Sequence, residues 1–325
     1  MPDAYVQLLG LLYRDQKGIV NGSAFFDIQR GVKQGDVISS MLFNAGLEAA
    51  FRSWKQRLCN HGFLLDEQKQ RLTNTRYADD VMLYGKSAEE ITEMTELLIE
   101  ELSKVGLHLN GSKTKILTTD PPEYEFLDIG GEMVEIIGTS STHKYLGRYL
   151  PGDLLERGTT EIAHRIQCAW FKFGKHARVL TNKSISVKLR LKLFDAAISP
   201  TILFGLCTLP VHETCLKKID VVQRKMYRKI VGWVRYDSEG WEVIMHRMKR
   251  RVDQALSQYK VCDWRERIRI MKMQMVTRIK GLPHDRWEAQ SSNWLPAEVH
   301  DYSQEYYAFR ERGRPLLQWN TNVGD

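Results

Sequence analysis

Cysteine is scarce in this chain: five residues are scattered singly along 325 positions. A disulfide scaffold needs an even set of closely spaced cysteines, so this class of small secreted fold is excluded. Long apolar runs are also missing, since no run reaches the length of a membrane span and the first residues have no secretory pattern. We therefore expect an intracellular protein, nuclear or cytoplasmic, without a membrane partner.

Acidic residues are few in the second part of the chain. Residues 151–325 hold 19 Asp and Glu against 31 Lys and Arg, whereas residues 1–150 hold 21 against 16, and the net charge is +7. This division fits metal chemistry in the first part and a polyanion bound to the second. Lysines on a solvated helical surface would give the same balance, so charge alone does not decide. With 43% hydrophobic residues, the chain can fold as two or three domains.

Two adjacent aspartates, Asp79 and Asp80, interrupt the apolar stretch from Arg76 to Gly85. The pattern predicts strand, tight turn, strand, and the simplest interpretation is a solvated loop tip because Asp is a natural turn residue. In a sheltered position, two carboxylates at about 4 Å repel by about 4 kcal/mol rather than the roughly 1 kcal/mol found in water. A sheltered pair therefore needs a cation, and hard oxygen ligands with open positions suit magnesium.

The segments before the aspartates predict helix, hairpin and helix. Residues 4–13 have helical spacing, and Asn21-Gly22 is a strong hairpin turn. The loop Gly31-Val32-Lys33-Gln34-Gly35-Asp36 then leads into apolar positions at helical intervals from Phe43 to Leu58, with Ser39 or Ser40 as the expected cap. The start of that helix offers unpaired N–H donors to an anion, although such a loop is more often only a turn.

After the aspartates, a capping box at Ser87-Ala88-Glu89-Glu90 starts a helix that ends near Gly106. Residues 107–109 and 115–118 are expected as strands around a turn at Asn110-Gly111. Hairpin, helix and strand together are typical of a split βαβ sheet with helices on one face. Two more short strands are expected at 134–137 and 144–150.

Beyond residue 151 the sequence becomes helical and basic, over residues 154–180, 183–198 and 213–235. Residues 151–235 hold 16 Lys and Arg against 6 Asp and Glu. Aromatic residues between the charges suit the binding of a nucleic-acid strand by charge and stacking, although most of them are expected in the helix core. They are Trp170, Phe171, Phe173, Phe194, Phe204, Tyr227 and Trp233.

In this order the motifs resemble those of the reverse transcriptases of non-LTR retrotransposons. The loop Gly31–Asp36 is similar to the family's fourth block, Tyr77-Ala78-Asp79-Asp80 to its catalytic block, and Leu109-Asn110 with Lys113-Thr114-Lys115 to the next. Tyr145-Leu146-Gly147 resembles the primer-grip hairpin. The resemblance covers nearly the whole chain. It implies an α+β partial palm over residues 1–150, an all-α basic thumb over 151–235 and a helical tail over 236–325.

The resemblance also implies a role for each matching residue. Asp79 and Asp80 would bind the catalytic magnesium ions, with manganese as an alternative, and Lys113 would neutralise or protonate the departing pyrophosphate. Gln34, Gly35 and Tyr77 would line the site of the template and the incoming nucleotide. Tyr145, Leu146 and Gly147 would hold the primer end. The implied partners are an RNA template, a DNA primer and deoxynucleoside triphosphates.

One departure from the family pattern concerns its first catalytic aspartate, which lies upstream of the helix that residues 4–13 resemble. Asp3, Asp15 and Asp27 do not match its position. We therefore expect a fragment truncated at its amino end, without the fingers, that extends primers poorly on its own. The alternative is a non-enzymatic remnant of a decayed element that still binds nucleic acid.

Two further motifs have simpler interpretations. Cys207, His212 and Cys215, with Cys262, match no zinc spacing that we can justify, so core cysteine is the expectation. Arg312-Gly313-Arg314-Pro315 is similar to arms that enter a narrow minor groove, but a disordered basic tail is preferred. We find no endonuclease or ribonuclease H motif.

Overall fold

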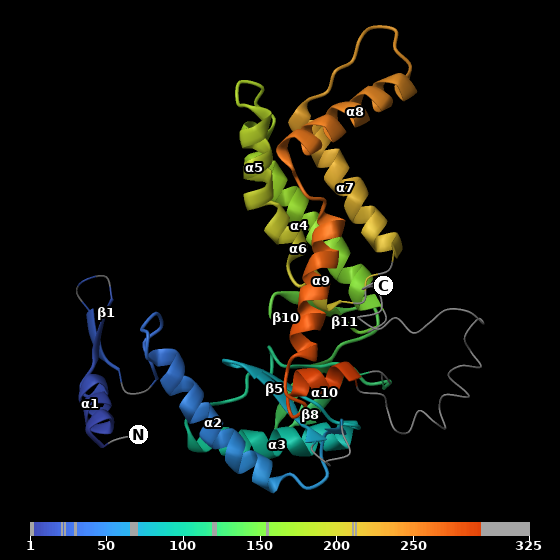
Figure 1. Cartoon of the computed structure of the whole chain (residues 1–325). Coiled ribbons are helices and arrows are strands. Elements are labelled where there is room, and N and C mark those ends of the chain that lie inside the picture. The colour runs from blue at the N-terminus through green and yellow to red at the C-terminus, as the bar shows by residue number, and fades with distance from the viewer. Residues whose placement is uncertain are drawn as a thin grey trace, which may run out of the picture. The chain divides into compact units, whose positions relative to one another are not determined.

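The computed structural model describes residues 3–20, 22, 24–28, 31–65, 71–118, 122–153, 156–209, 211 and 213–293. They belong to two compact units, whose helices and strands are labelled in Figure 1. The first unit consists of Met1–Phe63, Arg71–Asn110 and Asp128–Glu132. The second, called here the helical unit, consists of Leu64–Gln70, Gly111–Leu127 and Met133–Asp325.

The core of the first unit is formed by two helices, α2 (Ser39–Arg57) and α3 (Ala88–Lys104). Apolar residues of α2 recur every three or four positions, so they form one face that packs on α3. The ring of Trp54 is fully buried in this contact, and its Nε1 donates a hydrogen bond of 2.8 Å to the carbonyl oxygen of Met94. The buried indole N–H is thus satisfied, which a large aromatic core residue requires.

The amino-terminal elements are α1 (Asp3–Tyr13), β1 (Lys17–Val20) and β2 (Ala24–Asp27). They confirm the predicted helix and the hairpin after it, in which Gly22 has a φ of +75° and Asn21 lies outside the described residues. The predicted serine cap of α2 is wrong. Ser39 is already helical, and its hydroxyl lies 3.4 Å from that of Tyr13.

The predicted cap of α3 is confirmed. Ser87 precedes the helix, and its side chain accepts a hydrogen bond of 3.2 Å from the backbone N–H of Glu90. The Glu90 carboxylate does not return to Ser87, as an ideal capping box would require. It accepts instead from the backbone N–H groups of Lys86 and Gly62, at 2.7 and 2.6 Å. This carboxylate therefore ties the helix start to a distant loop.

The strands from residue 63 to residue 136 are divided among small separate sheets. Among the described strands, β5 (Asn74–Tyr77) and β6 (Asp80–Leu83) pair only with each other and form a hairpin. In the same way, β3 (Phe63–Leu64) and β4 (Arg71–Leu72) form a separate two-stranded sheet. In a third sheet β9 (Glu132–Ile136) lies between β7 (Lys115–Ile116) and β8 (Phe126–Ile129). The described strands therefore do not form the predicted single split βαβ sheet.

The pairing of β7 explains this difference. The strand is only two residues long, and it runs parallel to β9, with Ile116 opposite Ile136. The Lys115 ammonium lies 2.6 Å from the Glu135 carboxylate, which adds an ion pair to the same register. Residues 107–109, predicted as a strand, have no strand conformation. The chain is α+β as predicted, but its sheets are smaller.

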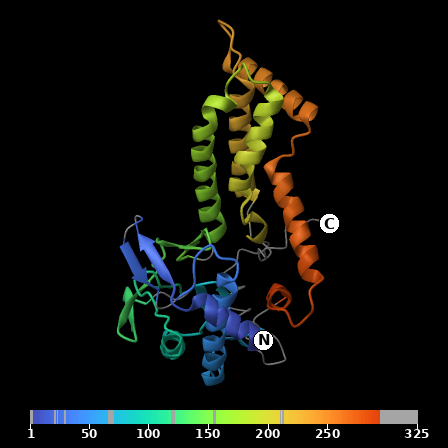
Figure 2. The same cartoon turned by 90° about the vertical axis from the view of Figure 1, so that its left-hand side faces the viewer.

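In the helical unit, the hairpin of β10 (Thr142–Tyr145) and β11 (Arg148–Pro151) is followed by helices. Figures 1 and 2 show α4, α5 and α7 running alongside one another. The helices are α4 (Arg157–Leu180), α5 (Val187–Ala197), α6 (Ser199–Leu203), the 3-10 turn η2 (Leu206–Thr208), α7 (Glu213–Val231), α8 (Trp241–Tyr259), α9 (Trp264–Lys280) and α10 (Trp287–Asn293). The predicted helical regions are confirmed.

Aromatic rings form the centre of this unit. Phe194 stacks on Trp264 with ring centroids 5.5 Å apart, and it also contacts Tyr227. The indole Nε1 of Trp264 donates to the Ser199 hydroxyl at 2.7 Å, and Gln223 donates to the Tyr227 hydroxyl at the same distance. Burial raises the pKa of Tyr227, which is therefore a neutral core residue.

One stretch of the described chain, Val187–Thr208, is long and apolar enough to cross a membrane by length and composition. In the structure this stretch is divided into α5, α6 and η2. Its apolar residues Leu191, Phe194 and Ile202 lie in the core of the helical unit. The core helix of a globular domain can have the same length and apolar composition as a membrane span. Packing in the core of the helical unit is therefore the simpler explanation of the apolar residues in Val187–Thr208.

Candidate active site

The two aspartates lie at the turn of the β5–β6 hairpin. Tyr77 pairs with Asp80, so Ala78 and Asp79 form the two-residue connection between the strands. Ala78 has a φ of +53°, a left-handed conformation that costs a residue with a Cβ about 1–2 kcal/mol. The predicted strand–turn–strand segment is confirmed, and the turn is held in a strained backbone conformation.

The aspartates are exposed rather than sheltered. Asp79 and Asp80 are both exposed in the first unit, and Tyr77 beside them is 69% exposed. The sheltered position that would require a cation is therefore not found among the described residues, and the exposure matches the simplest interpretation, a solvated turn. In water the repulsion between two such carboxylates is only about 1 kcal/mol, so the pair is tolerated without a cation. Exposure also leaves both carboxylates accessible to a substrate that brings its own metal ion.

An arginine beside the aspartates fixes their hairpin to α2. The Arg76 guanidinium, on β5, lies 2.7 Å from the Glu48 carboxylate and 4.3 Å from the centre of the Phe51 ring. Hydrogen bonds from Arg76 and then Arg52 lower the pKa of Glu48. Sequence reasoning missed this contact because Arg76 and Glu48 are 28 positions apart, with no local pattern that connects them.

We expect Arg76→Ala to lower the free energy of unfolding of the first unit by about 1 kcal/mol, since it removes an ion pair and a cation–π contact. Arg52→Ala is the matched control, because Arg52 binds the same carboxylate at 2.9 Å but its side chain is 76% exposed. Measured by urea unfolding, the free energy of unfolding of the control variant should differ little from that of the unchanged chain. Equal losses in the two variants would contradict a specific anchor at Arg76.

The glycine-bearing loop before α2 has the backbone that its glycines allow. Gly31 and Gly35 have φ values of +94° and +93°, and a Cβ at either position would meet open space. The glycines are therefore required by conformation, not by a close neighbour. Gln34 and Gly35 are exposed, in the same unit as the aspartates.

The other predicted site residues belong to the helical unit. Lys113 is exposed in a turn over residues 111–113. Tyr145 ends β10, and Leu146 and Gly147 form the turn to β11 with φ values of +47° and +75°. Positive φ at both central residues is the geometry of a type I′ hairpin turn, which is unusual for leucine.

A buried ion pair of α4 holds this second hairpin. Arg165 donates to the carbonyl oxygen of Gly147 at 2.5 Å and lies 2.6 Å from the Glu161 carboxylate. Glu161 in turn accepts a hydrogen bond of 2.8 Å from the backbone N–H of Tyr149. The side chain of Glu161 is 1% exposed and that of Arg165 is 9% exposed. Sequence reasoning missed this pair; its spacing of four residues is typical of a helical ion pair, but nothing in the sequence indicates its burial.

Residues 5–150 match the family described as reverse transcriptase (RNA-dependent DNA polymerase), a range that contains both hairpins and the glycine-bearing loop. Residues 5–150 belong to the reverse transcriptase family. The predicted resemblance to the reverse transcriptases of non-LTR retrotransposons is confirmed.

Curated relatives of this chain come from transposable elements. A transposon-derived protein of Caenorhabditis elegans is 24% identical over 257 residues, which cover 78% of this chain and 85% of the relative. The Retrovirus-related Pol polyprotein from type-1 retrotransposable element R2 of Nasonia vitripennis is 25% identical over 63% of the chain, and the 149 kDa protein of transposon TX1 from Xenopus laevis is 25% identical over 61%. The matches span only 19% and 14% of the latter two proteins.

The donor set of the reverse transcriptase hairpin fits a hard divalent cation. Asp79 and Asp80 supply carboxylate oxygens, and magnesium is commonly held by one or two carboxylates together with substrate phosphates. Within the described ranges, no group of three or more His, Cys, Asp and Glu residues is placed to hold a metal ion. A cation at this hairpin would therefore take its remaining ligands from a bound triphosphate and water.

The cysteines weighed as zinc ligands occupy different environments. Cys215 is buried in the helical core, as expected, whereas Cys207 is half-buried and Cys262 is exposed. His212 lies outside the described residues, as does the segment Arg312–Pro315. The core interpretation, which was based on the apolar run before Cys207, holds only in part: Cys207 is half-buried, whereas Cys215 belongs to the core.

Proposed function

We propose that this chain is the palm and thumb part of an RNA-directed DNA polymerase that adds nucleotides to a primer 3′ end. The observation that carries the proposal is the exposed Asp79-Asp80 pair on a strained hairpin turn within the reverse transcriptase match. In this proposal residues 1–150 are the partial palm, residues 151–235 the thumb and residues 236–325 a helical tail.

Each predicted site residue then has a chemical role. Asp79 and Asp80 hold magnesium, or manganese, which supplies positive charge to the triphosphate of the incoming nucleotide. The exposed Lys113 ammonium neutralises or protonates the departing pyrophosphate. Gln34, Gly35 and Tyr77 line the site of the template and the nucleotide. Phosphoryl transfer depends mostly on positioning and charge compensation, and in this proposal these groups would supply them.

The primer end is held by the hairpin of Tyr145, Leu146 and Gly147. The ion pair of Glu161 and Arg165 supports this role, because it fixes the turn through the Gly147 carbonyl and the Tyr149 N–H. The reaction slows greatly when the attacking hydroxyl is displaced by about 1 Å, so a hairpin that holds the primer end needs rigid support. Arg165 is in this sense a positioning residue.

The test is incorporation of radiolabelled deoxynucleotides on an RNA template with a DNA primer. We expect slow synthesis by this chain alone with magnesium or manganese, because the first aspartate of the family pattern has no match among its residues. Chelation of the metal should abolish incorporation. Fast synthesis would contradict the proposed impairment, and synthesis that persists in chelator would contradict the metal role of the aspartates.

A second candidate is a non-enzymatic nucleic-acid-binding remnant. The observation that favours it is the exposure of the aspartate pair, with no third candidate metal ligand grouped with it among the described residues. Salt-sensitive binding of nucleic acid is expected for both candidates. Metal-dependent incorporation distinguishes them, since a remnant would bind the primer and template without extending the primer.

A further inference from the structure

The junction of α7 and α8 is a basic part of the helical unit that also carries exposed aromatic rings. Residues 213–259, which contain α7, the connection 232–240 and α8, hold eleven Lys and Arg against six Asp and Glu. We call residues 224–252 the α7–α8 corner. None of these residues belongs to the hairpins that carry Asp79-Asp80 or Leu146-Gly147.

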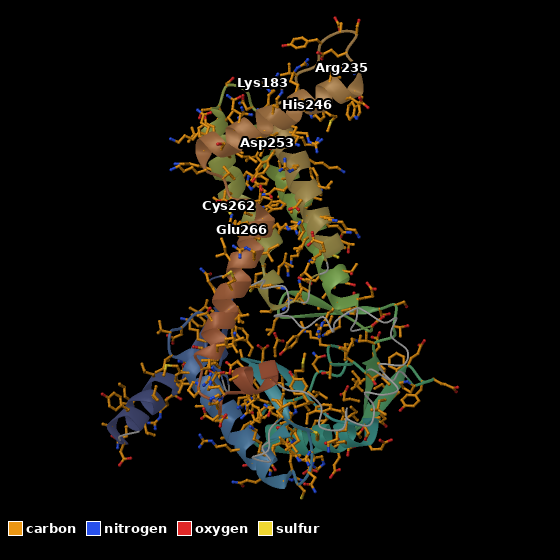
Figure 3. All side chains as sticks on the ribbon, turned by 45° about the vertical axis from the view of Figure 1, so that its right-hand side comes forward. Lys183, Arg235, His246, Asp253, Cys262 and Glu266 are labelled. Atoms are coloured by element: carbon orange, nitrogen blue, oxygen red, sulfur yellow. The ribbon has the colours of Figure 1, made fainter. Side chains whose placement is uncertain are left out.

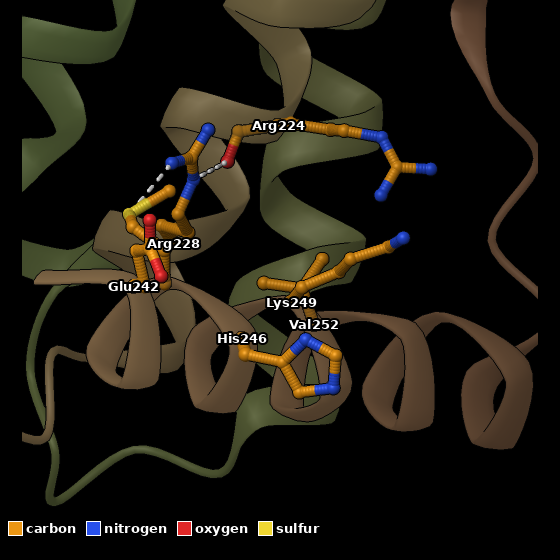
Figure 4. A pocket seen from close by; sticks show the side chains of 7 residues that line it. Arg224, Arg228, Glu242, His246, Lys249 and Val252 are labelled. Carbon is orange, nitrogen blue, oxygen red and sulfur yellow. Dashed lines mark hydrogen bonds between the residues drawn. The ribbon is translucent and has the colours of Figure 1, made fainter.

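A cavity of about 590 Å³ lies between the two helices at this corner. Its walls carry three permanent cations, Arg224, Arg228 and Lys249, together with His246 and a single carboxylate, Glu242. Figure 4 shows the Arg224 guanidinium and the Lys249 ammonium extending into the same opening above the His246 ring. Like charges gathered in a concave site repel one another and favour an anion between them.

The cations of the cavity are only partly neutralised by the protein. Arg224 lies 3.1 Å from Asp253, in a pair that is about half exposed and therefore weak. Arg228 donates to the Arg224 carbonyl oxygen and to the sulfur of Met245, and it forms no ion pair within 4 Å with a carboxylate of the described residues. The cavity thus presents fixed positive charge toward solvent.

Exposed aromatic residues lie in and beside the connection between the helices, where Trp241 directly precedes the cavity-lining Glu242 in the sequence. Trp233 stacks on Trp241 with ring centroids 6.0 Å apart and an interplanar angle of 23°, and the two residues are 43% and 67% exposed. Tyr236, between them in sequence, is 60% exposed. Figure 3 shows Arg235 of this connection at the end of the helical unit, beyond His246 of α8.

The connection is held in place rather than loose. Arg247 of α8 forms an ion pair with Glu239, in which both side chains are largely buried, and its guanidinium lies 4.4 Å from the centre of the Tyr236 ring. These contacts lower the pKa of Glu239 and raise that of Arg247, so both stay charged at neutral pH. The exposed rings therefore have a fixed platform, which reduces the entropy cost of binding.

We propose that the α7–α8 corner binds an unpaired nucleic-acid strand, with a backbone phosphate in the cavity and a base stacked on the Trp233–Trp241 pair. A phosphodiester supplies the anion that the cavity lacks, and every base has a face that can extend an aromatic stack. A duplex is a poorer fit because its bases already stack on one another. An acidic peptide would use the charges but not the two stacked rings.

Fluorescence anisotropy with labelled single strands of RNA and of DNA, in chelator so that no metal chemistry contributes, tests the charge. We expect Arg224→Glu combined with Lys249→Glu to weaken binding at least tenfold. Lys188→Glu combined with Lys192→Glu, two exposed lysines of α5, is the matched control for net charge. Equal loss in the control, or unchanged binding in the corner variant, would overturn the proposal.

Stacking is tested separately with Trp241→Ala and Trp241→Phe. The alanine variant should weaken binding about tenfold, whereas phenylalanine should restore most of it. A single strand with 5-iodouridine should crosslink within residues 233–241. In a separate competition without crosslinking, a duplex should displace the labelled single strand poorly. Unchanged binding in Trp241→Ala, crosslinks confined to other segments, or displacement by an acidic peptide as efficient as by a single strand would overturn the proposal. Since no step requires synthesis, failure of the polymerase proposal leaves these results interpretable.

Discussion

Asp79→Asn is expected to lower metal-dependent nucleotide incorporation by at least about a hundredfold. The substitution keeps the shape of the side chain at the hairpin turn but removes one of two carboxylates that would hold the cation. Charge compensation by a metal ion is worth several kcal/mol, and each 1.36 kcal/mol of barrier is about tenfold in rate. Incorporation of radiolabelled nucleotide detects even a slow enzyme, so the loss is measurable.

The control for Asp79→Asn is Glu132→Gln, which removes one negative charge from an exposed strand position of the same unit. Incorporation by this variant should match that of the unchanged chain. Binding of the primer and template should be similar in both variants, since the aspartate acts on the nucleotide. Incorporation that survives Asp79→Asn would remove the hairpin from the proposed chemistry.

Arg165→Met is expected to lower the free energy of unfolding of the helical unit by about 3 kcal/mol. The substitution leaves the carboxylate of Glu161, which is 1% exposed, without its cation, and breaking a buried pair on one side costs about 3–5 kcal/mol. It also removes the hydrogen bond to the Gly147 carbonyl. Urea unfolding gives the stability, and hydrogen exchange of β10 and β11 gives the local effect.

The double variant Glu161→Gln, Arg165→Met should recover most of that loss. Neither member of the pair then carries a charge, and the glutamine oxygen can still accept from the Tyr149 N–H. The primer hairpin would nevertheless lack its hold on Gly147, so hydrogen exchange there should stay fast. A single variant that costs less than about 1 kcal/mol would mean that Glu161 is hydrated or protonated once Arg165 is gone.

Local features of the fold were predictable from the sequence. The Ser87 cap, the Gly22 turn and the helical spacing of Leu47, Phe51 and Trp54 depend on a few neighbouring residues, and each has its predicted structure. The strand–turn–strand pattern around Asp79 is local in the same sense. The order of the motifs was sufficient to indicate the family.

Long-range pairing was not predictable. β7 pairs with β9 and not with the hairpin before it. The contacts of this pairing join Ile116 to Ile136 and Lys115 to Glu135, and each pair is twenty positions apart in the sequence. Among the aromatics of the basic region, Phe173 and Tyr227 are buried while Phe171 is 68% exposed, a difference set by helix packing and invisible in composition. The Arg76 and Arg165 anchors depend on tertiary contacts for the same reason.

Cleavage by iron tests the central claim most directly. Fe²⁺ bound in place of magnesium, with ascorbate and peroxide, generates hydroxyl radicals that cut the backbone near the metal. With a nucleoside triphosphate present, the account predicts cuts within residues 74–84, and their loss in the variant that combines Asp79→Asn and Asp80→Asn. Cuts confined to other segments, or a pattern unchanged in that variant, would contradict the assignment of the aspartate hairpin as the metal-binding part of a polymerase site.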